Sequence, residues 1–284
     1  MKITIARDAG YCFGVRDAVN LAYETAEERG DVYMLGDIVH NERVVEDLAE
    51  AGTKVVESLD EIPDDRPVLF RAHGTAENVW EAAKEKDIDI VDATCPLVQE
   101  IHDEVEKLST DGRQIIIIGD HGHDEVVGIM SHADNPIVVA TPEEASALRK
   151  MKRAGVVSQS TQTIENVQAI INILMTKVFD LHFINTICFP TKRNQEQIKE
   201  LAAESDVMII IGSFTSANSK RLTELAVEIN PSTYQVTCAD EIEPGWFDEA
   251  EKVGVSAGAS TPDYLIEEVH KKLKSLSPVT EEVF

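Results

Sequence analysis

Three cysteines each stand 28 residues before a polar side chain that follows a short apolar run. The pairs that share this spacing are Cys12 with His40, Cys95 with His123, and Cys188 with Ser216. An offset that recurs three times in 284 residues indicates an internal repeat, with one cysteine at the start of each copy.

A second polar turn occurs further along each copy, again after an apolar run. These turns are Arg71-Ala72-His73-Gly74-Thr75, Ser158-Gln159-Ser160-Thr161 and Ala257-Gly258-Ala259-Ser260-Thr261. Their distances from the three cysteines differ, so the loops vary in length, but the order of features is the same in each copy. This nested match favours a structural repeat over coincidence.

Three thiolates that gather at one point would suit a soft metal centre, either zinc or an iron–sulfur cluster. With three cysteine ligands, a cubane cluster keeps one iron for substrate, whereas zinc would take a fourth ligand or a catalytic water. The alternative is three unrelated cysteines in hydrophobic interiors. The matched spacing favours the metal centre, and Cys238, outside the repeat, is expected to be a small core residue.

The predicted turns between strands and helices carry many hydrogen-bond donors. The donor side chains are His40, His73, His123, Thr191, Ser216, Asn218 and Ser260. Together with the backbone N–H groups at helix starts, they indicate a site for an anion such as a phosphate or diphosphate. Glu125, two residues after His123, either moves protons or is an acidic residue stabilised by the helix dipole, and spacing alone leaves both open.

Short apolar segments alternate with amphipathic ones along the chain, which predicts an α/β fold of parallel sheets covered by helices. Strands are expected at 2–6, 32–35, 68–70, 88–91, 115–118, 156–157, 207–211 and 253–255. Helices are expected at 15–26, 41–51, 76–86, 97–108, 164–174, 218–229 and 263–273, and a further helix is expected to begin near Pro190.

The repeat predicts three similar α/β units around a pseudo-threefold axis, with the active site at the centre. The expected units are 13–95, 96–188, and 189–284 together with 1–12. Ligands of open α/β sheets bind beyond the carboxyl ends of the strands. The three cysteines would therefore meet at one centre, ringed by six polar turns.

The composition and the absence of certain motifs exclude several kinds of binding partner and cofactor. The net charge of −26, from 26 basic and 52 acidic residues, argues against binding to nucleic acid or to anionic membranes. No uncharged apolar run approaches the ~18 residues that span a bilayer, and no cleavage signal is visible at the start, so a cytoplasmic protein is expected. Four widely spaced cysteines do not resemble a disulfide scaffold. Motifs for ATP, dinucleotides or a serine nucleophile are absent from the sequence.

The sequence resembles the 4-hydroxy-3-methylbut-2-enyl diphosphate reductase family, which acts last in the methylerythritol phosphate route to isoprenoids. The resemblance covers essentially the whole chain. The segments that carry it are Gly10-Tyr11-Cys12-Phe13-Gly14-Val15, Leu35-Gly36-Asp37-Ile38-Val39-His40-Asn41, Arg71-Ala72-His73-Gly74, Asp92-Ala93-Thr94-Cys95-Pro96, Gly122-His123-Asp124-Glu125-Val126, Asn185-Thr186-Ile187-Cys188 and Ala257-Gly258-Ala259-Ser260-Thr261-Pro262-Asp263.

The resemblance implies a reductive dehydroxylation that yields isopentenyl and dimethylallyl diphosphate. It implies that Cys12, Cys95 and Cys188 hold a [4Fe–4S] cluster that delivers two electrons, and that Glu125 donates the proton with which the hydroxyl leaves as water. The residues that match the substrate pocket are His40, His73, His123, Ser160, Thr161, Ser216, Ala217, Asn218 and Ser260, and Thr191 is expected beside them. An electron donor such as ferredoxin or flavodoxin is also implied.

Two positions depart from the family's pattern. The usual Gln-Thr-Thr reads Gln159-Ser160-Thr161, so a hydroxyl is kept and a methyl group lost, and the usual Ser-Ser-Asn reads Ser216-Ala217-Asn218, so a hydroxyl is lost. Both changes bear on substrate affinity. Two other functions remain open: a pseudo-threefold iron–sulfur enzyme like quinolinate synthase, and a non-catalytic protein that binds a phosphometabolite and structural zinc.

Overall fold

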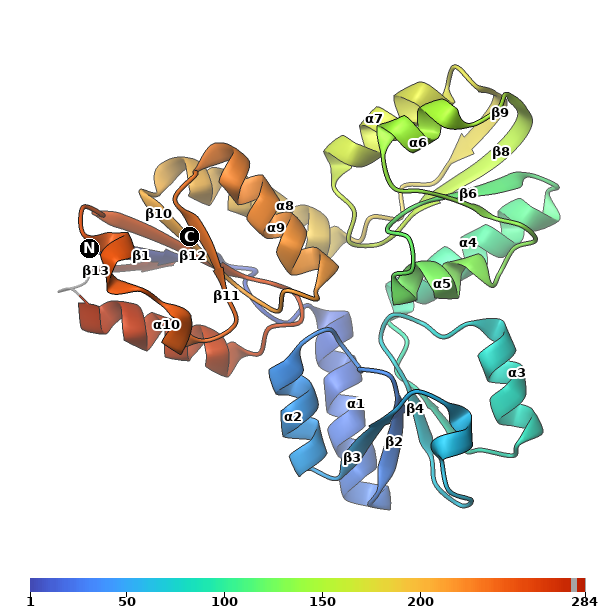
Figure 1. The fold of residues 1–284 in the computed structure, drawn as a ribbon, viewed down its shortest axis with the longest axis horizontal. Helices are drawn as coiled ribbons and strands as arrows, with labels where there is room; N and C mark the ends of the chain where they lie inside the picture. Colours follow the sequence, from blue (N-terminus) through green and yellow to red (C-terminus); the bar gives the residue numbers. More distant parts are fainter. Residues whose placement is uncertain (277–279, 284) are drawn as a thin grey trace. The chain divides into compact units, whose positions relative to one another are not determined.

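The computed structural model describes residues 1–276 and 280–283. The chain packs into two compact units: one holds Met1–Val15, His40–Val44 and the part from Phe189 onward, and the other holds Arg16–Val39 and Val45–Cys188. Each unit is built from parallel sheets covered by helices (Figure 1). The predicted α/β class is confirmed.

The Arg16–Val39 and Val45–Cys188 unit contains two four-stranded sheets with the orders β3-β2-β4-β5 and β7-β6-β8-β9. The strands are β2 (Val32–Leu35), β3 (Thr53–Val56), β4 (Val68–Phe70), β5 (Ile90–Asp92), β6 (Gln114–Ile118), β7 (Ile137–Val139), β8 (Met151–Ser158) and β9 (Val178–Phe183). The helices between these strands are α2 (Glu42–Glu50), η1 (Leu59–Glu61), α3 (Glu77–Glu85), α4 (Pro96–Thr110), α5 (Asp124–Met130), α6 (Pro142–Ala147) and α7 (Ile164–Leu174).

The other unit contains one five-stranded sheet with the order β11-β10-β12-β1-β13. Its strands are β1 (Lys2–Ile5), β10 (Val207–Ile211), β11 (Thr233–Val236), β12 (Lys252–Ala257) and β13 (Thr280–Val283). Its helices are α8 (Phe189–Glu204), α9 (Ala217–Ile229), η2 (Ala239–Glu241), η3 (Pro244–Phe247) and α10 (Asp263–Leu276). Helix α1 (Phe13–Arg29) starts in this unit and continues into the other.

The same order of four strands is repeated in all three sheets, and the five-stranded sheet adds β13 beside β1. In each, the two central strands are followed by the two polar turns, and the next strand is followed by the cysteine: β5 by Cys95, β9 by Cys188 and β1 by Cys12. Every strand pairing is parallel, so these features lie at the carboxyl-end edge of their sheet. The prediction of three similar α/β repeats is thus confirmed as three parallel sheets with helices, whereas the predicted boundaries 13–95, 96–188 and 189–284 with 1–12, and the arrangement around an axis, stay predictions.

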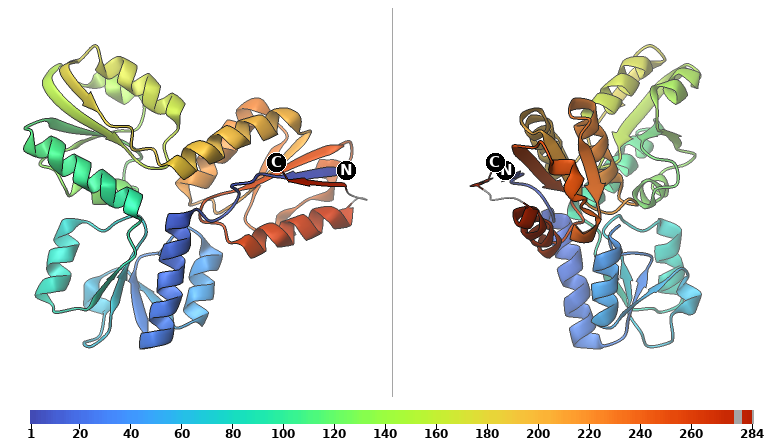
Figure 2. Two further views of the ribbon diagram at one scale, coloured as in Figure 1. Left: turned by 180° about the vertical axis from the view of Figure 1, so that it is seen from behind. Right: turned by 60° about the vertical axis from the view of Figure 1, so that its left-hand side comes forward.

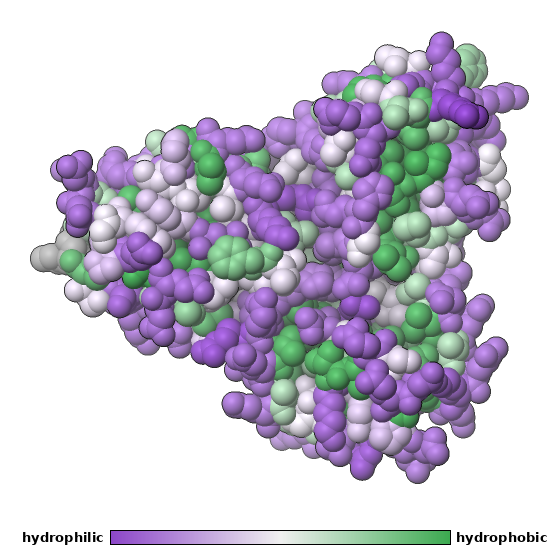
Figure 3. Space-filling model, in the orientation of Figure 1, coloured by the Kyte–Doolittle hydropathy of each residue, from purple (hydrophilic) through white to green (hydrophobic). Residues whose placement is uncertain are grey.

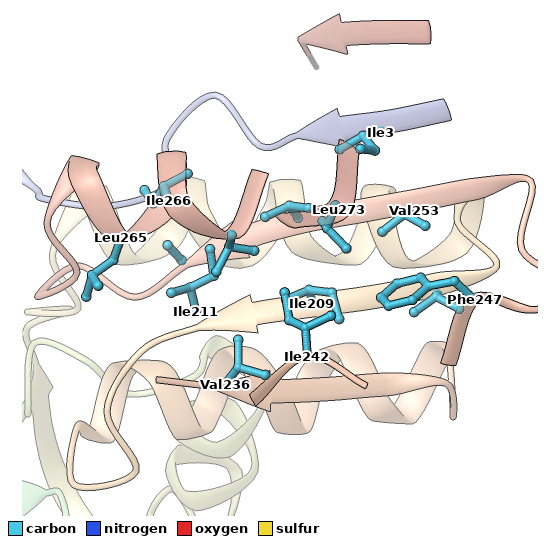
Figure 4. Close-up of a cluster of buried hydrophobic side chains, with 14 residues drawn as sticks. Ile3, Ile209, Ile211, Val236, Ile242, Phe247, Val253, Leu265, Ile266 and Leu273 are labelled. Atoms are coloured by element: carbon cyan, nitrogen blue, oxygen red, sulfur yellow. The ribbon is translucent and has the colours of Figure 1, made fainter. Parts of the chain in front are cut away.

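Burial on both faces explains the unbroken apolar strands. In β6, the four residues Ile115 to Ile118 are at most 1% exposed, as expected for a parallel strand between two helical layers. In the five-stranded sheet, Leu265, Ile266 and Leu273 of α10 pack against the side chains of the central strands (Figure 4). This packing fixes the strand ends that bear the polar turns.

The outer strands of the sheets differ from the prediction. β3, β7, β9, β11 and β13 were not expected, and each is an edge strand. The predicted final helix at 263–273 is confirmed, but the chain continues into β13, which pairs with β1 (Figure 2). Cys238 is half-buried at the start of η2, so its assignment to the core was wrong.

Hydrophilic side chains dominate the visible face of the molecule, and hydrophobic ones form separate patches on it (Figure 3). This distribution agrees with the excess of acidic residues in the sequence. Among the described residues, no helix combines the length and the apolar character needed to cross a bilayer.

A stacked histidine pair, in which His102 is buried, gives the free energy of unfolding a specific pH dependence. His102 of α4 stacks on His132 with ring centroids 4.2 Å apart, and Nδ1 of His132 lies 2.8 Å from a carboxylate oxygen of Glu106. Burial, and secondly the neighbouring His132, lower the pKa of His102 from 6.5 to about 4. As the pH falls below 6.5, His102 therefore binds a proton in the unfolded chain before it does so in the folded protein. The free energy of unfolding consequently decreases between pH 6.5 and 4.

We expect His102→Gln to remove up to about 3 kcal/mol of this pH dependence. Urea unfolding midpoints, measured without oxygen at pH 7 and pH 4.5, check the prediction. The unaltered protein should lose more stability between the two pH values than the variant does, and the exposed His182→Gln should behave like the unaltered protein. Equal losses in all three proteins would contradict a neutral His102.

Candidate active site

The three cysteines of the repeat occupy the same local position. Each directly precedes a helix: Cys12 precedes α1, Cys95 precedes α4 and Cys188 precedes α8. The backbone N–H of each donates to a carbonyl in the second polar turn of the same sheet; the acceptors are Ala259 for Cys12, Ala72 for Cys95 and Ser160 for Cys188. All four cysteines are thiols rather than disulfides.

Side chains three residues earlier shape two of these cysteine loops. Asp92 accepts from the backbone N–H and the hydroxyl of Thr94, at 3.0 and 2.5 Å. Asn185 accepts from the backbone N–H of Ile187 at 3.3 Å. These Asx turns replace strand pairing just before Cys95 and Cys188, and they direct the chain into the following helix.

The helices that follow the cysteines begin without acidic residues. The first turns of α1, α4, α8 and α9 contain no Asp or Glu, whereas each of the other α-helices in the described part of the chain has at least one there. The chain has twice as many acidic as basic residues, so this exception is informative. A helix N-terminus attracts negative charge. Because no acidic side chain occupies the first turn of these four helices, their N-termini can stabilise a cysteine thiolate or a bound anion instead.

In the unit that contains Cys95 and Cys188, the polar turns after β4 and β6 lie together. The rings of His73 and His123 pack edge to face with centroids 5.7 Å apart. Arg71 pairs with Asp124 at 2.5 Å. Gly36, at φ +72°, leaves room for the guanidinium of Arg71, which a Cβ would approach within 2.8 Å. The first polar turn and the start of α5 are thereby tied to each other.

Glu125 is the only buried carboxylate among the residues that the structure describes, with 2% of its surface exposed. The backbone N–H of Ser160 donates to one of its oxygens at 2.5 Å, and the hydroxyl of Ser160 donates to the other at 2.8 Å. The backbone N–H of Glu125 itself donates to Nδ1 of His123 at 3.2 Å. Glu125 also lies in the first turn of α5, where the helix dipole stabilises a negative charge. Its burial and the hydrogen bonds to both of its oxygens distinguish it from an ordinary acidic residue in a first turn.

The polar turns of the other unit surround the start of α9. The hydroxyl of Ser216 caps the helix by accepting from the N–H of Ser219, and Ala217 is the first helical residue. The side chain of Asn218 is 5% exposed, and its amide nitrogen has no protein acceptor within the described part of the chain. A buried donor without an acceptor is costly unless a ligand accepts from it.

Tight packing holds this turn in place. A Cβ on Gly212 or Gly258 would overlap the hydroxyl of Ser219, so both positions require glycine for the close approach of α9 to β10 and β12. The hydroxyl of Ser260 donates to the carbonyl of His40 at 3.0 Å. Thr191 is buried on the first turn of α8. His40, Ser216 and Ser260 therefore belong to one unit.

The predicted site residues thus fall into two sets. His73, His123, Glu125, Ser160 and Thr161 lie in the unit with Cys95 and Cys188; the others, including Cys12, lie in the second unit. Convergence of the three cysteines stays a prediction.

Sequence reasoning missed several positioning residues. Asn41, rather than His40, caps α2: its side-chain oxygen accepts from the N–H groups of Arg43 and Val44 at 3.1 and 3.3 Å. Gln159 is fully buried and accepts from the N–H of Asp120 at 2.9 Å. The asparagine after a strand is a recognisable helix-capping signal. No local signal marks this role of Gln159, because its partner Asp120 lies in the turn after the neighbouring strand β6.

Parallel sheets, repeated cysteine loops and a buried acid among histidines define a class of α/β enzyme whose chemistry takes place at the strand ends. The model of the LytB protein family matches residues 3–274, and the chain belongs to this family.

Relatives cover nearly the whole chain. It is 42% identical over 278 residues to 4-hydroxy-3-methylbut-2-enyl diphosphate reductase of Geotalea uraniireducens (strain Rf4), which covers 98% of each chain. It is also 42% identical to the enzyme of that name from Geobacter sulfurreducens, over 96% of this chain and 97% of the relative.

Two solved structures are similar. One is (E)-4-hydroxy-3-methyl-but-2-enyl diphosphate reductase, described as the terminal enzyme of the non-mevalonate pathway, with 39% identity, a TM-score of 0.72 and coverage of 97% of this chain and 100% of that one. The other is E-1-hydroxy-2-methyl-but-2-enyl-4-diphosphate reductase from Plasmodium falciparum, with 25% identity, a TM-score of 0.94 and coverage of 100% and 92%.

Proposed function

We propose that this protein reduces (E)-4-hydroxy-3-methylbut-2-enyl diphosphate to isopentenyl and dimethylallyl diphosphate. The observation that carries the proposal is the full-length similarity to reductases of that substrate. In the balanced reaction, the substrate takes up two electrons and two protons, its C–O bond breaks and water leaves.

Cys12, Cys95 and Cys188 would hold a [4Fe–4S] cluster. Their repeated position before acid-free helix starts supports this assignment, because the position favours thiolates, the form that binds iron. When bound, such a cluster would supply the two electrons that the reaction consumes. Intact thiols also fit a reducing compartment, so we place the protein in the cytoplasm.

The diphosphate would bind to hydrogen-bond donors of the polar turns. Asn218 supports this role best, because its buried amide nitrogen has no acceptor among the described residues and the start of α9 adds backbone N–H groups. The remaining donors are assigned to the same pocket; they are His40, His73, His123, Ser160, Thr161, Thr191, Ser216, the backbone N–H of Ala217, and Ser260. Hydrogen-bond donors of this kind can bind an anion without a cluster of Lys and Arg side chains.

Glu125 would supply the proton for the leaving hydroxyl. Its two oxygens are fixed by Ser160, and helix α5 holds its backbone. A fixed, buried carboxylic acid suits general acid catalysis, because the proton donor does not have to be oriented during the reaction. The hydroxyl of Ser160 is retained despite the departure from threonine, and it orients Glu125 in this structure.

Anaerobic purification, iron analysis and an assay with the allylic diphosphate test the function. We expect iron and sulfide in the protein, and formation of both products when reduced methyl viologen supplies electrons. An iron–sulfur protein that leaves the diphosphate unchanged would favour a quinolinate synthase-like reaction. Stoichiometric zinc without turnover would favour the phosphometabolite-binding alternative.

A further inference from the structure

A pair of exposed aromatic rings lies next to two of the cysteine positions. Phe13 is 38% exposed and Phe189 is 53% exposed, and their rings stack in parallel with centroids 5.5 Å apart. Phe13 directly follows Cys12, and Phe189 directly follows Cys188. Single exposed hydrophobic residues are common on protein surfaces, but a stacked pair from two helix starts is a contiguous apolar contact area.

The immediate surroundings of this pair contain both basic and acidic side chains, whereas the protein as a whole is strongly acidic. Arg16 and the exposed Asp17 follow Phe13 at the three- and four-residue spacings of α1. Lys192 and Arg193 follow Phe189 at the three- and four-residue spacings that place side chains on one face of α8. The first turns of α1 and α8 contain no acidic residue. Asp8 is a nearby acid, and it is paired with Arg193 at 2.7 Å. An acidic partner would therefore meet less repulsion here than the net charge of −26 implies.

We propose that Phe13, Phe189, Lys192 and Arg193 form the docking surface for an acidic ferredoxin-type electron carrier. This inference rests on the proposed function, because only a reductase with a cluster at Cys12 and Cys188 needs electrons at this place. Interfaces of electron-transfer proteins are small, with an apolar centre and a charged rim. The phenylalanine pair supplies the centre. Lys192 supplies the charge at the rim that attracts the carrier, because Arg193 is already paired with Asp8.

Binding and turnover with two reductants test the proposal. Phe189→Ala should weaken the binding of oxidised ferredoxin by about tenfold or more, as expected for a central aromatic contact. The kcat/KM for reduced ferredoxin should fall similarly, while iron content and viologen-driven turnover change by less than about twofold. Phe179→Ala is the matched control, because Phe179 is 91% exposed but lies on the edge strand β9.

Lys192→Gln provides a second variant that leaves the aromatic pair intact. It should weaken ferredoxin binding at low salt and reduce the salt dependence of binding, again without loss of iron. Unchanged ferredoxin binding in both variants would overturn the docking surface even if the enzyme is an active reductase. Loss of viologen-driven turnover in the unaltered protein would instead contradict the proposed function.

Discussion

Replacing Cys95 with serine is expected to remove the iron–sulfur cluster and turnover while leaving the fold intact. Cys95 is the N-cap of α4, and its side chain makes no capping hydrogen bond. Serine is among the preferred N-cap residues, so the substitution should not weaken the helix. Changes to the surroundings of metal ligands already lower metal affinity or activity by about 10- to 100-fold, so loss of a ligand should exceed ~100-fold.

Iron content, the visible absorbance of the cluster and viologen-driven turnover measure this effect, and circular dichroism checks the fold. Serine at Cys12 or Cys188 should give the same result, because all three cysteines precede helices in the same way. Cys238→Ser is the matched control: Cys238 is also an N-cap without a side-chain cap bond, at η2, and it should keep the cluster. Full iron content in Cys95→Ser would remove Cys95 from the metal centre.

The fold was predictable from sequence where strands are buried. Central strands such as β6 and β10 consist of unbroken apolar residues, since helices cover both faces. All the strands missed are at sheet edges, where polar residues are tolerated: β3 reads Thr53-Lys54-Val55-Val56, and β11 reads Thr233-Tyr234-Gln235-Val236. The sequence of β13, Thr280-Glu281-Glu282-Val283, is acidic and has no pattern typical of a strand. It is identified as a strand only by its pairing with β1.

The candidate site was predictable in its residue types but not in its contacts. The equal 28-residue offset from a cysteine marked His123 and Ser216, because a structural repeat keeps a turn at the same position in each copy. The same offset marked His40 at the turn after β2, but it did not show that the next residue, Asn41, caps α2. The bond between Glu125 and Ser160 joins residues 35 apart in sequence. It follows from the adjacency of β6 and β8, a pairing that no local pattern encodes.

Glu125→Gln is expected to lower kcat by about 10²-fold or more without loss of iron. Glutamine has nearly the same shape, and its amide oxygen can still accept from the N–H of Ser160, but it carries no proton to give to the leaving hydroxyl. General acid catalysis contributes about 10²- to 10⁴-fold, which sets the expected size. Because the fold and the donors for the diphosphate are untouched, KM should change far less than kcat.

Single-turnover reduction with excess reduced viologen isolates this step from electron delivery by a protein partner. Glu144→Gln is the matched control: Glu144 also lies in the first turn of a helix, α6, and accepts a backbone N–H, from Ala140 at 2.8 Å. It should turn over at the unaltered rate. Ser160→Ala should have an intermediate effect, since it removes one of the two bonds that orient Glu125 and leaves the acid in place. Wild-type kcat in Glu125→Gln would show that the proton comes from elsewhere, and a loss of iron together with kcat would mean that Glu125 supports the metal centre instead.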